Sequence, residues 1–484
     1  MEVSEKQIRS IVEQVVHGLD LSSPGAAAPA FPGAPGTPRT EETQPGIFAD
    51  IDAAVDAARS AQEKLIQATL ELRREMVRSM REKVTAELEK ISRLTVEETG
   101  MGRWQDKVVK NQLAALKTPG VEDLQPTCYS DDHGLTLTER APYGVIGAIA
   151  PSTNPTETII NNAISMIAGG NTVVFNSHPA AKRVSSLTVA LLNEAITQVG
   201  GPADCLAACA EPTIETAQRL MNHPDIALLV VTGGPAVVRE ALKSSKKVIA
   251  AGPGNPPCVV DETADLVKAG RDIVRGASLD NNIICICEKE ILAVAAIADR
   301  LKAEMVKNGA FELNRAQTEA VTRLVIQEPG GPGREGAVNK RWVGRNAHLI
   351  AQEIGLVVPE PTRLLLCEVE RDHPLVWTEQ LMPVMPLVRF ADVDEAIDFA
   401  RECEHGFRHT AVMHSLNIEK LSRMAKVMNC SLFVKNGSAY NGMAQGGAGY
   451  TSYTIASPTG EGFTRARTFT RLRRCALIDY FRIV

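Results

Sequence analysis

The chain has 484 residues, of which 44% are hydrophobic, and a formal net charge of −6 from 52 basic and 58 acidic side chains. This length exceeds one typical core, so two or three domains are expected, and the absence of a basic block argues against nucleic acid as a partner. No apolar run approaches the roughly 20 residues that cross a bilayer, which argues against a membrane protein. The ten cysteines are scattered, and the N-terminus lacks a signal-peptide pattern, so a reducing cytoplasm is favoured.

The first 46 residues combine an amphipathic pattern with a low-complexity segment. Apolar residues within 1–20 recur at helical spacing, at Ile8, Ile11, Val12, Val15 and Leu19. This spacing predicts a helix with one apolar stripe. Residues 21–46 are largely rich in Pro, Gly and Ala and predict a flexible linker. The tethered helix is either a docking peptide for a partner surface or a helix that packs on its own enzyme.

The rest of the chain has the pattern of an α/β protein. Residues 47–108 are Ala-, Glu- and Arg-rich and predict helices, whereas short β-branched runs alternate with helical segments from residue 143 onward. Strand, helix and strand in that order favour βαβ units and parallel sheets. Strands are predicted at 145–150, 172–175, 227–231 and 258–261, and helices at 159–168, 185–199, 265–276 and 293–308.

One cysteine follows a clear turn signal. Asp280, Asn281 and Asn282 predict a turn, and Cys285 comes three residues later in an apolar stretch. A free thiol is only a few per cent ionised near neutral pH, so a nucleophilic role requires groups that stabilise the thiolate. The competing interpretation is a small buried hydrophobic residue, which is the commoner role for a free cysteine.

Several motifs that follow one another along the chain resemble, in the same order, those of the aldehyde dehydrogenase superfamily. More narrowly, they resemble its CoA-acylating branch, the propionaldehyde and acetaldehyde dehydrogenases of bacterial microcompartments. The motifs are Ala150-Pro-Ser-Thr-Asn154-Pro-Thr-Glu-Thr, Val231-Thr-Gly-Gly-Pro, Ala250-Ala-Gly-Pro-Gly-Asn-Pro-Pro, Asp280-Asn-Asn with Cys285, Thr378-Glu379-Gln-Leu-Met-Pro, His409-Thr-Ala-Val-Met-His-Ser and Thr459-Gly-Glu-Gly. The resemblance covers almost everything after about residue 47.

The resemblance implies roles for two catalytic residues. Cys285 matches the nucleophile that adds to the aldehyde carbonyl to form a thiohemiacetal. Asn154 matches the side-chain donor to the oxyanion, with the backbone N–H of Cys285 as the second donor. Without the resemblance, Asn154 would be interpreted as a residue of an Asn-Pro turn.

The resemblance also implies an NAD site. Thr232, Gly233 and Gly234 stand between a predicted strand and a predicted helix, where a glycine pair lets the backbone approach a phosphate; the alternative is a plain tight turn. Glu379 matches the carboxylate that binds the nicotinamide ribose. Pro151 and His178 are placed at the same cofactor site, although relatives carry a Lys near His178, so the choice of NAD over NADP is not fixed by that position.

A missing carboxylate points to the acylating reaction. Hydrolytic relatives carry a Glu that activates water, and the matching segment here reads Ala250-Ala251-Gly252-Pro253-Gly254. Alanine cannot act as a general base. A Cys285 thioester would therefore persist until CoA takes the acyl group, in a ping-pong reaction, unless Glu157, Glu262 or Glu288 reaches the site.

Other candidate residues are assigned structural roles or left open. Cys287 would face away from Cys285 if the two lay on a strand, and no further Cys/His pair with zinc spacing lies nearby, so no metal site is predicted. His409 and His414 either line the active site or are structural. Ala448 stands where relatives carry a Glu, near the expected acyl pocket.

The resemblance implies an architecture, an assembly and a location. A Rossmann-type NAD-binding domain is expected over 47–257, a catalytic α/β domain over 258–448, and a return segment over 449–484 that builds a β oligomerisation arm together with 128–142. Such arms exchange between subunits, so a dimer or tetramer is expected. Residues 1–20 match helices that bind a shell protein, which implies a cytoplasmic enzyme inside a bacterial microcompartment.

Propionaldehyde is the favoured substrate, because the motifs look closer to the propanediol-pathway members. One methylene in an apolar pocket is worth only about 1–3 kcal/mol, so acetaldehyde should also react. Three alternatives remain open: an enzyme that prefers acetaldehyde, a hydrolytic aldehyde dehydrogenase, and a catalytically silent assembly protein of the microcompartment.

Overall fold

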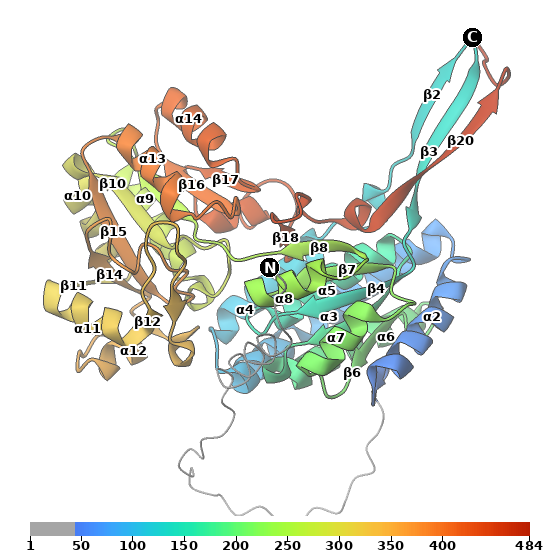
Figure 1. The fold of residues 1–484 in the computed structure, drawn as a ribbon, viewed down its shortest axis with the longest axis horizontal. Coiled ribbons are helices and arrows are strands. Elements are labelled where there is room, and N and C mark those ends of the chain that lie inside the picture. Colours follow the sequence, from blue (N-terminus) through green and yellow to red (C-terminus); the bar gives the residue numbers. More distant parts are fainter. Residues whose placement is uncertain (1–43) are drawn as a thin grey trace, which may run out of the picture. The chain divides into compact units, whose positions relative to one another are not determined.

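The computed structural model describes residues 44–484 (Figure 1). The predicted targeting helix over 1–20 and nearly all of the predicted linker over 21–46 lie outside the described residues. Two parallel sheets and a three-stranded antiparallel arm organise the described part of the chain.

Residues 47–251 contain a six-stranded parallel sheet in the order β1-β6-β5-β4-β7-β8. Its strands are β1 (Ile47–Phe48), β4 (Val145–Ala150), β5 (Thr172–Ser177), β6 (Leu206–Cys209), β7 (Leu228–Thr232) and β8 (Lys247–Ala251). The chain runs from β4 through β5 to β6 and then returns to place β7 on the other side of β4. Parallel sheets bind ligands at such switch points, at the carboxyl ends of the strands.

Helices cover both faces of this sheet. In β4, Ile146 and Ala148 belong to the core shared with α3, α5 and α6, whereas Val145 and Ile149 belong to the core shared with α2, α7 and α8. This division follows from the alternation of side chains along a strand. The helices of this region are α2 (Ile51–Leu65), α3 (Leu70–Thr99), α4 (Trp104–Lys117), α5 (Pro155–Ala168), α6 (Lys182–Gln198), α7 (Ile214–Asn222) and α8 (Pro235–Leu242).

Local capping explains why the long helical pattern after residue 47 is divided into separate helices. The Asp50 side chain accepts a hydrogen bond from the N–H of Ala53 (2.9 Å) and begins α2. The Thr69 hydroxyl caps α3 in the same way. Gly100, with φ of 67°, ends α3, because glycine adopts the left-handed conformation without a steric cost.

Residues 257–435 contain a seven-stranded parallel sheet in the order β11-β14-β15-β10-β9-β16-β17. Its strands are β9 (Pro257–Val260), β10 (Glu290–Val294), β11 (Ala310–Leu313), β14 (Leu364–Glu368), β15 (Val384–Phe390), β16 (Thr410–His414) and β17 (Leu432–Lys435). The helices are α9 (Leu266–Ala277), α10 (Ala295–Lys307), α11 (Arg315–Val325), α12 (Ala347–Glu353), α13 (Val393–Cys403) and α14 (Ile418–Met428). Two short antiparallel pairs join β12 (Ile326–Glu328) to β13 (Ala337–Val338) and β18 (Ile455–Ala456) to β19 (Gly462–Phe463).

The arm projects from the six-stranded region and carries the C-terminus at its tip (Figure 1). It consists of β2 (Thr127–Asp131), β3 (Gly134–Pro142) and β20 (Thr470–Ile478), in the order β2-β3-β20. Its large apolar side chains are exposed, among them Tyr129, Leu472, Leu477 and Ile478. The arm was predicted from 128–142 and the return segment 449–484; within the second range, only 470–478 joins the arm.

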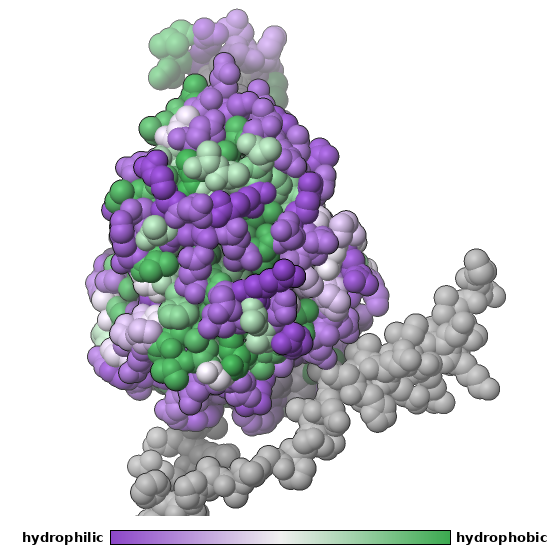
Figure 2. All heavy atoms as spheres, turned by 90° about the vertical axis from the view of Figure 1, so that its left-hand side faces the viewer, coloured by the Kyte–Doolittle hydropathy of each residue, from purple (hydrophilic) through white to green (hydrophobic). Residues whose placement is uncertain are grey.

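The predicted α/β class with parallel sheets is confirmed, and the strands and helices predicted between 145 and 308 are present. Within residues 44–484, no helix is long and apolar enough to cross a membrane. Figure 2 shows the side of the seven-stranded sheet, where hydrophilic side chains predominate and apolar ones gather in smaller areas.

Candidate active site

Four loops meet at the amino edge of the seven-stranded sheet. They precede the neighbouring strands β15, β10, β9 and β16 and carry Glu379, Cys285, Gly254 and His409, respectively. Gly254 lies at the centre of this group: a Cβ added to it would lie 2.7 Å from the Cys285 carbonyl oxygen and 3.1 Å from His409 Cγ. The fold therefore brings together residues that are far apart in the sequence.

A tight turn leads into Cys285. Asp280, Asn281 and Asn282 have φ values of 47°, 56° and 66°, in the left-handed region that Asp and Asn tolerate better than other residues with side chains. The Asn282 side chain donates to the carbonyl oxygen of Ala277 (2.6 Å) and fixes the turn to the end of α9. The predicted turn is confirmed, and its side-chain bonds hold the backbone that presents the thiol.

The Cys285 side chain is partly exposed, but its thiol lies in a poorly solvated environment. Burial, and then the Glu379 carboxylate, raise the pKa of this thiol to about 12, while the Lys289 and Lys110 ammonium groups lower it. The reactive thiolate is therefore a minor species at neutral pH. Charges around Cys285 control how much of it forms.

Glu379 and the loop that carries Cys285 both contact the backbone of Gly254. Its Oε1 accepts a hydrogen bond from the Gly254 N–H at 3.4 Å. Burial raises the pKa of Glu379 to about 7, although the Lys289 ammonium opposes this shift. A carboxyl group that is partly ionised near neutral pH therefore lies beside the Cys285 thiol.

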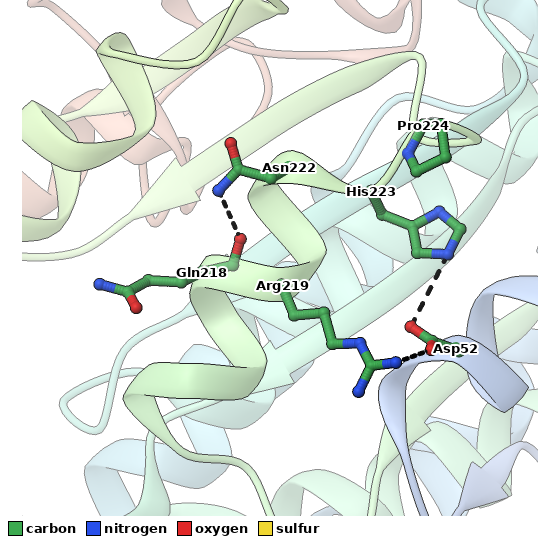
Figure 3. Close-up of a pocket in the computed structure, with 6 residues that line it drawn as sticks. All are labelled: Asp52, Gln218, Arg219, Asn222, His223 and Pro224. Carbon is green, nitrogen blue, oxygen red and sulfur yellow. Dashed lines mark hydrogen bonds and ion pairs between the residues drawn. The ribbon is translucent and has the colours of Figure 1, made fainter.

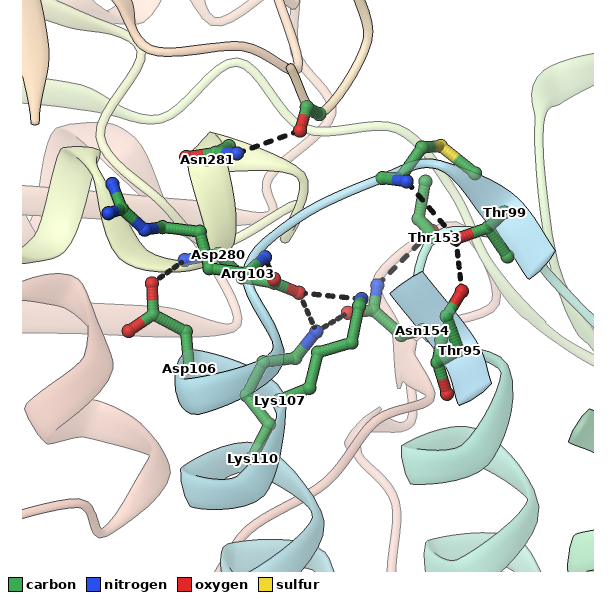
Figure 4. A network of polar contacts seen from close by, with 12 residues as sticks. Thr95, Thr99, Arg103, Asp106, Lys107, Lys110, Thr153, Asn154, Asp280 and Asn281 are labelled. Atoms are coloured by element: carbon green, nitrogen blue, oxygen red, sulfur yellow. Dashed lines mark hydrogen bonds and ion pairs between the residues drawn. The ribbon is translucent and has the colours of Figure 1, made fainter. Parts of the chain in front are cut away.

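Asn154 belongs to a buried network of charged groups (Figure 4). Its Oδ1 accepts a hydrogen bond from Lys110 Nζ at 2.6 Å. The same ammonium lies 2.6 Å from Asp280 Oδ2 and 3.0 Å from Glu157 Oε1, and Lys107 Nζ lies 2.9 Å from Asp280 Oδ2. Both lysine side chains are fully buried. The network joins α4, the N-terminus of α5 and the turn before Cys285.

The sequence patterns identify neither Lys107 nor Lys110 as a site residue. They lie three positions apart on α4, where lysines of an amphipathic helix ordinarily face water. The available signal was their neighbourhood: Asn111 and Ala114 on the same face are also buried. Such a polar stripe does not by itself identify the buried partner, because Asp280 lies 170 residues from Lys110 in the sequence.

Except for Glu379, the residues predicted to bind the cofactor follow three adjacent strands at the carboxyl edge of the six-stranded sheet. Pro151 follows β4, His178 follows β5, and Thr232 ends β7. Gly233 and Gly234 lead into α8, whose first N–H groups have no side-chain cap. A Cβ on Gly234 would meet no atom within 4 Å. The space beside this helix N-terminus is thus open, as a phosphate group requires.

Similarity to known proteins decides the family. Residues 41–322 match the family described as "Aldehyde dehydrogenase family". The chain belongs to the aldehyde dehydrogenase family. The resemblance stated from the sequence motifs is confirmed at this level.

Individual relatives of this aldehyde dehydrogenase align along nearly its whole length. It is 49% identical over 491 residues to the acetaldehyde dehydrogenase (acetylating) of Bilophila wadsworthia, with 100% of both chains covered. It is 46% identical to the propanal dehydrogenase (CoA-propanoylating) of Salmonella typhimurium, with 90% of this chain and 93% of the relative covered. The solved propionaldehyde dehydrogenase of Rhodopseudomonas palustris, which holds CoA and an acylated cysteine, matches with a TM-score of 0.87 and 47% identity over 90% of this chain and 98% of that chain.

Cys287 of this aldehyde dehydrogenase was predicted to have a structural role. Cys287 is buried, but the expectation that 285 and 287 would alternate along a strand is wrong, because 283–287 forms turns and bends. The N–H of Cys287 donates to the carbonyl oxygen of Ile284 (3.1 Å), which closes one of these turns.

The two histidines occupy different places. His409 packs against Gly254 beside the nucleophile loop, and its Nδ1 lies 2.9 Å from the Thr410 hydroxyl. His414 is buried at the other end of β16. Burial lowers the pKa of each imidazole to about 4, so both are neutral at pH 7. Ala448 is exposed, in a loop.

A surface pocket of about 500 Å³ lies between α2 and α7 (Figure 3). Asp52 of α2 forms an ion pair with Arg219 of α7, and His223 Nε2 lies 3.8 Å from the same carboxylate. The pocket shares no lining residue with the groups around Cys285. It is therefore not the candidate active site.

A second cavity, of about 390 Å³, borders the Asp280 turn. Asp106, which lines it, accepts hydrogen bonds from the Asp280 N–H (3.0 Å) and from Arg363 (2.9 Å). Val109, Leu279 and Tyr440 also line it. Within residues 44–484, no cluster of His, Cys, Asp and Glu is arranged to hold a metal ion.

Proposed function

We propose that this protein oxidises a short aliphatic aldehyde to its acyl-CoA, with NAD as hydride acceptor and CoA as acyl acceptor. The observation that carries this proposal is the partly exposed Cys285 residue at the junction of four loops, with alanine in the segment that matches the hydrolytic base of relatives. Relatives named as acetylating and CoA-propanoylating enzymes, 49% and 46% identical to this chain, support the acyl transfer.

In the proposed reaction, the Cys285 thiolate attacks the aldehyde carbonyl and forms a carbon–sulfur bond. The carbonyl electron pair moves to oxygen, and the Asn154 side-chain N–H and the Cys285 backbone N–H donate to this oxyanion. The oxyanion returns its electrons as C1 loses a hydride, which leaves a thioester on Cys285. The CoA thiolate then attacks the thioester carbonyl and expels the Cys285 thiolate, which releases acyl-CoA.

The open space at the carboxyl edge of the six-stranded sheet fits the pyrophosphate of a dinucleotide, beside Gly234 and the uncapped N-terminus of α8. Glu379, at the amino edge of the seven-stranded sheet, supplies a carboxylate for a ribose hydroxyl. When bound, NAD supplies the acceptor for the hydride.

The carboxylates considered for hydrolysis support acyl transfer to CoA rather than to water. Glu157 is engaged by Lys110, and Glu288 accepts from the Ala439 N–H at 2.8 Å. Glu262 is exposed after β9, whereas Cys285 precedes β10 at the opposite edge of the sheet. Glu379, with a pKa of about 7, is the carboxyl group whose position favours hydrolysis as a second candidate activity.

One assay separates these activities: NADH formation from propionaldehyde, with and without CoA, for the native chain and Cys285→Ala. Acyl transfer predicts sustained NADH formation only with CoA, and none for Cys285→Ala. Sustained NADH formation without CoA would establish hydrolysis instead. An active Cys285→Ala variant would refute both mechanisms, and an inactive native chain would favour an assembly protein.

The substrate is proposed to be propionaldehyde or acetaldehyde. The sequence motifs favour propionaldehyde, whereas the chain is 49–50% identical to relatives named for acetaldehyde and 45–46% identical to those named for propanal. Because one methylene changes binding by only about 1–3 kcal/mol, both aldehydes should react. The ratio of their kcat/KM values decides the preference.

We further propose that residues 1–20 bind a shell protein and place the enzyme in a bacterial microcompartment. Their amphipathic sequence supports this, as does a relative from a fucose-utilisation microcompartment of Clostridium phytofermentans, 44% identical to this chain. Deletion of residues 1–20 should leave activity intact and abolish co-localisation with shell proteins. Retained co-localisation would refute the proposal.

The arm is proposed to form a homo-oligomer, a dimer or a tetramer. Exposed Leu472 and Leu477 on β20 are apolar groups that a partner subunit would cover. Replacing both with Lys should lower the molar mass measured by light scattering to that of smaller species. An unchanged mass would argue against this interface.

A further inference from the structure

Lys110 is a buried cation that donates two hydrogen bonds and forms an ion pair with a further carboxylate. Its Nζ donates to Asn154 Oδ1 and to Asp280 Oδ2, both at 2.6 Å (Figure 4). It also forms an ion pair with Glu157 Oε1 at 3.0 Å. An ammonium group has three donors and no acceptor. Burial alone would lower the pKa of Lys110, but the Asp280 and Glu157 carboxylates raise it above its usual value. Lys110 therefore remains charged in the folded protein.

This contact fixes the orientation of the Asn154 amide. Because an ammonium can only donate, the Asn154 atom that lies 2.6 Å from Lys110 Nζ must be the oxygen. A flipped amide would place its own N–H groups against a cation. Nδ2 is thereby held on the other side, where it donates one hydrogen bond to the Thr153 hydroxyl (3.2 Å) and keeps its second N–H to donate elsewhere.

The backbone around Asn154 does not hold this orientation by itself. Asn154 occupies the N-cap position of α5, yet its side chain makes no capping hydrogen bond to the helix. Asparagine at this position ordinarily turns its oxygen toward the N–H groups of the first turn. Here the oxygen is bound by Lys110 instead, so the lysine determines where the amide nitrogen points.

We propose that Lys110 is a positioning residue for the reaction, which holds the Asn154 amide with its N–H toward the oxyanion. The inference rests on the proposed function, in which Asn154 donates to that oxyanion. A charged donor on the amide oxygen also polarises the amide and makes its N–H a stronger donor. The Lys110 ammonium also lowers the pKa of the Cys285 thiol, by less than the Lys289 ammonium does.

Lys107 provides a matched control within the same network. It is equally buried, and its ammonium lies 2.9 Å from the same Asp280 oxygen. Within the described residues, it makes no hydrogen bond to Asn154 and is not among the charges that shift the Cys285 pKa. Burial and the neighbouring Lys110 ammonium lower the pKa of Lys107, whereas the pKa of Lys110 is raised. Loss of Lys107 therefore removes a buried amino group bound to Asp280 without releasing the amide.

The test compares kcat and KM of the full-length Lys110→Met and Lys107→Met variants with propionaldehyde, NAD and CoA. Lys110→Met should lower kcat by about 10²-fold, the usual cost of losing one oxyanion donor, with little change in KM. Lys107→Met should lower kcat less than tenfold. Equal losses in the two variants would overturn the proposal, because they would indicate a structural role for the network.

A double variant tests whether Lys110 acts through Asn154. The kcat of Lys110→Met with Asn154→Ala should equal that of Asn154→Ala, apart from the effect of the lost charge on the thiol. If the two losses in kcat multiply as independent effects, the positioning role is refuted. That charge effect is measured separately, as slower alkylation of Cys285 by iodoacetamide at pH 8 in Lys110→Met than in Lys107→Met. If Lys110→Met does not fold, Lys110→Met with Glu157→Gln removes one cation and one anion together, and the same outcomes apply. A fully active Asn154→Ala would instead refute the oxyanion role in the proposed function.

Discussion

The backbone N–H of Gly254 donates to the Glu379 carboxylate, with 3.4 Å between the nitrogen and Oε1, and the same glycine lies against the Cys285 carbonyl oxygen. Gly254, which has no side chain, thus separates Cys285 from Glu379. After burial itself, the Glu379 carboxylate is the largest cause of the raised pKa of Cys285. This arrangement makes the reactivity of the thiol dependent on the ionisation of Glu379.

We predict that Glu379→Gln increases the alkylation rate of Cys285 at pH 8. The pKa of Glu379 is about 7, so above pH 7 its negative charge opposes thiolate formation, whereas below pH 7 it is mostly neutral. The neutral amide removes this opposition and should raise the rate on the order of 3–10-fold at pH 8, with little change at pH 6. Iodoacetamide labelling of Cys285, followed by mass spectrometry across this pH range, measures the effect.

The native protein should show its own signature in the same experiment. The logarithm of its labelling rate should rise with pH less steeply around pH 7 than that of Glu379→Gln, because Glu379 ionises there. Glu288→Gln serves as a control, since Glu288 is not among the charges that shift the Cys285 pKa. Parallel profiles for the native chain and Glu379→Gln would contradict the coupling.

We predict that Gly254→Ala impairs catalysis more than it impairs folding. The new Cβ would lie 2.7 Å from the Cys285 carbonyl oxygen, so the nucleophile loop must shift. A displacement approaching 1 Å can lower the rate by up to about 10²-fold, while the overpacking costs about 1–3 kcal/mol of stability. Steady-state kcat and urea unfolding measure the two effects. Gly331→Ala, where a Cβ meets nothing within 4 Å, should be neutral in both.

Local patterns were sufficient to predict the α/β class and the individual strands and helices named between residues 145 and 308. β4 and α6 have unmistakable β-branched and helical patterns, and Asp280-Asn-Asn indicates a turn because Asp and Asn tolerate positive φ. These features depend on neighbours within a few residues. Periodicity and turn chemistry capture interactions of that range.

The assembly of the site depends on contacts of much longer range. Gly254 and Glu379 are 125 residues apart, and Lys110 and Asp280 are 170 residues apart. Parallel sheets ordinarily bind ligands at their carboxyl edge, whereas Cys285, Gly254 and Glu379 meet at an amino edge. Family motifs could identify Cys285 and Glu379, but the lysine that orients Asn154 carries no local signal that separates it from a solvated lysine.

We predict that Gly234→Ala raises the KM for NAD without lowering stability by more than about 1 kcal/mol. Gly234 has φ of −68°, which alanine adopts freely, and its Cβ would meet no protein atom within 4 Å. The same methyl group would occupy the space at the N-terminus of α8 where a phosphate is proposed to bind, so a KM increase of about tenfold is expected. Initial rates at varied NAD and a thermal melt without ligand provide the measurements. An unchanged KM would argue against cofactor binding at this helix.

We predict that Glu288→Gln raises the free energy of unfolding relative to the native protein by more at pH 8 than at pH 5. Burial raises the pKa of Glu288 to about 7, although its carboxylate accepts a hydrogen bond from the Ala439 N–H. Between pH 4.5 and about 7, the Glu288 carboxyl is ionised in the unfolded chain but still protonated in the folded protein. The free energy of unfolding therefore falls as pH rises through this range, and the whole loss is present above pH 7. Gln carries no such proton and still offers an oxygen to Ala439. The variant should therefore gain on the order of 2–3 kcal/mol over the native protein between pH 5 and pH 8, measured by urea unfolding at both values. A difference between the two proteins that does not change with pH would show that Glu288 is already ionised at pH 5 in the folded state.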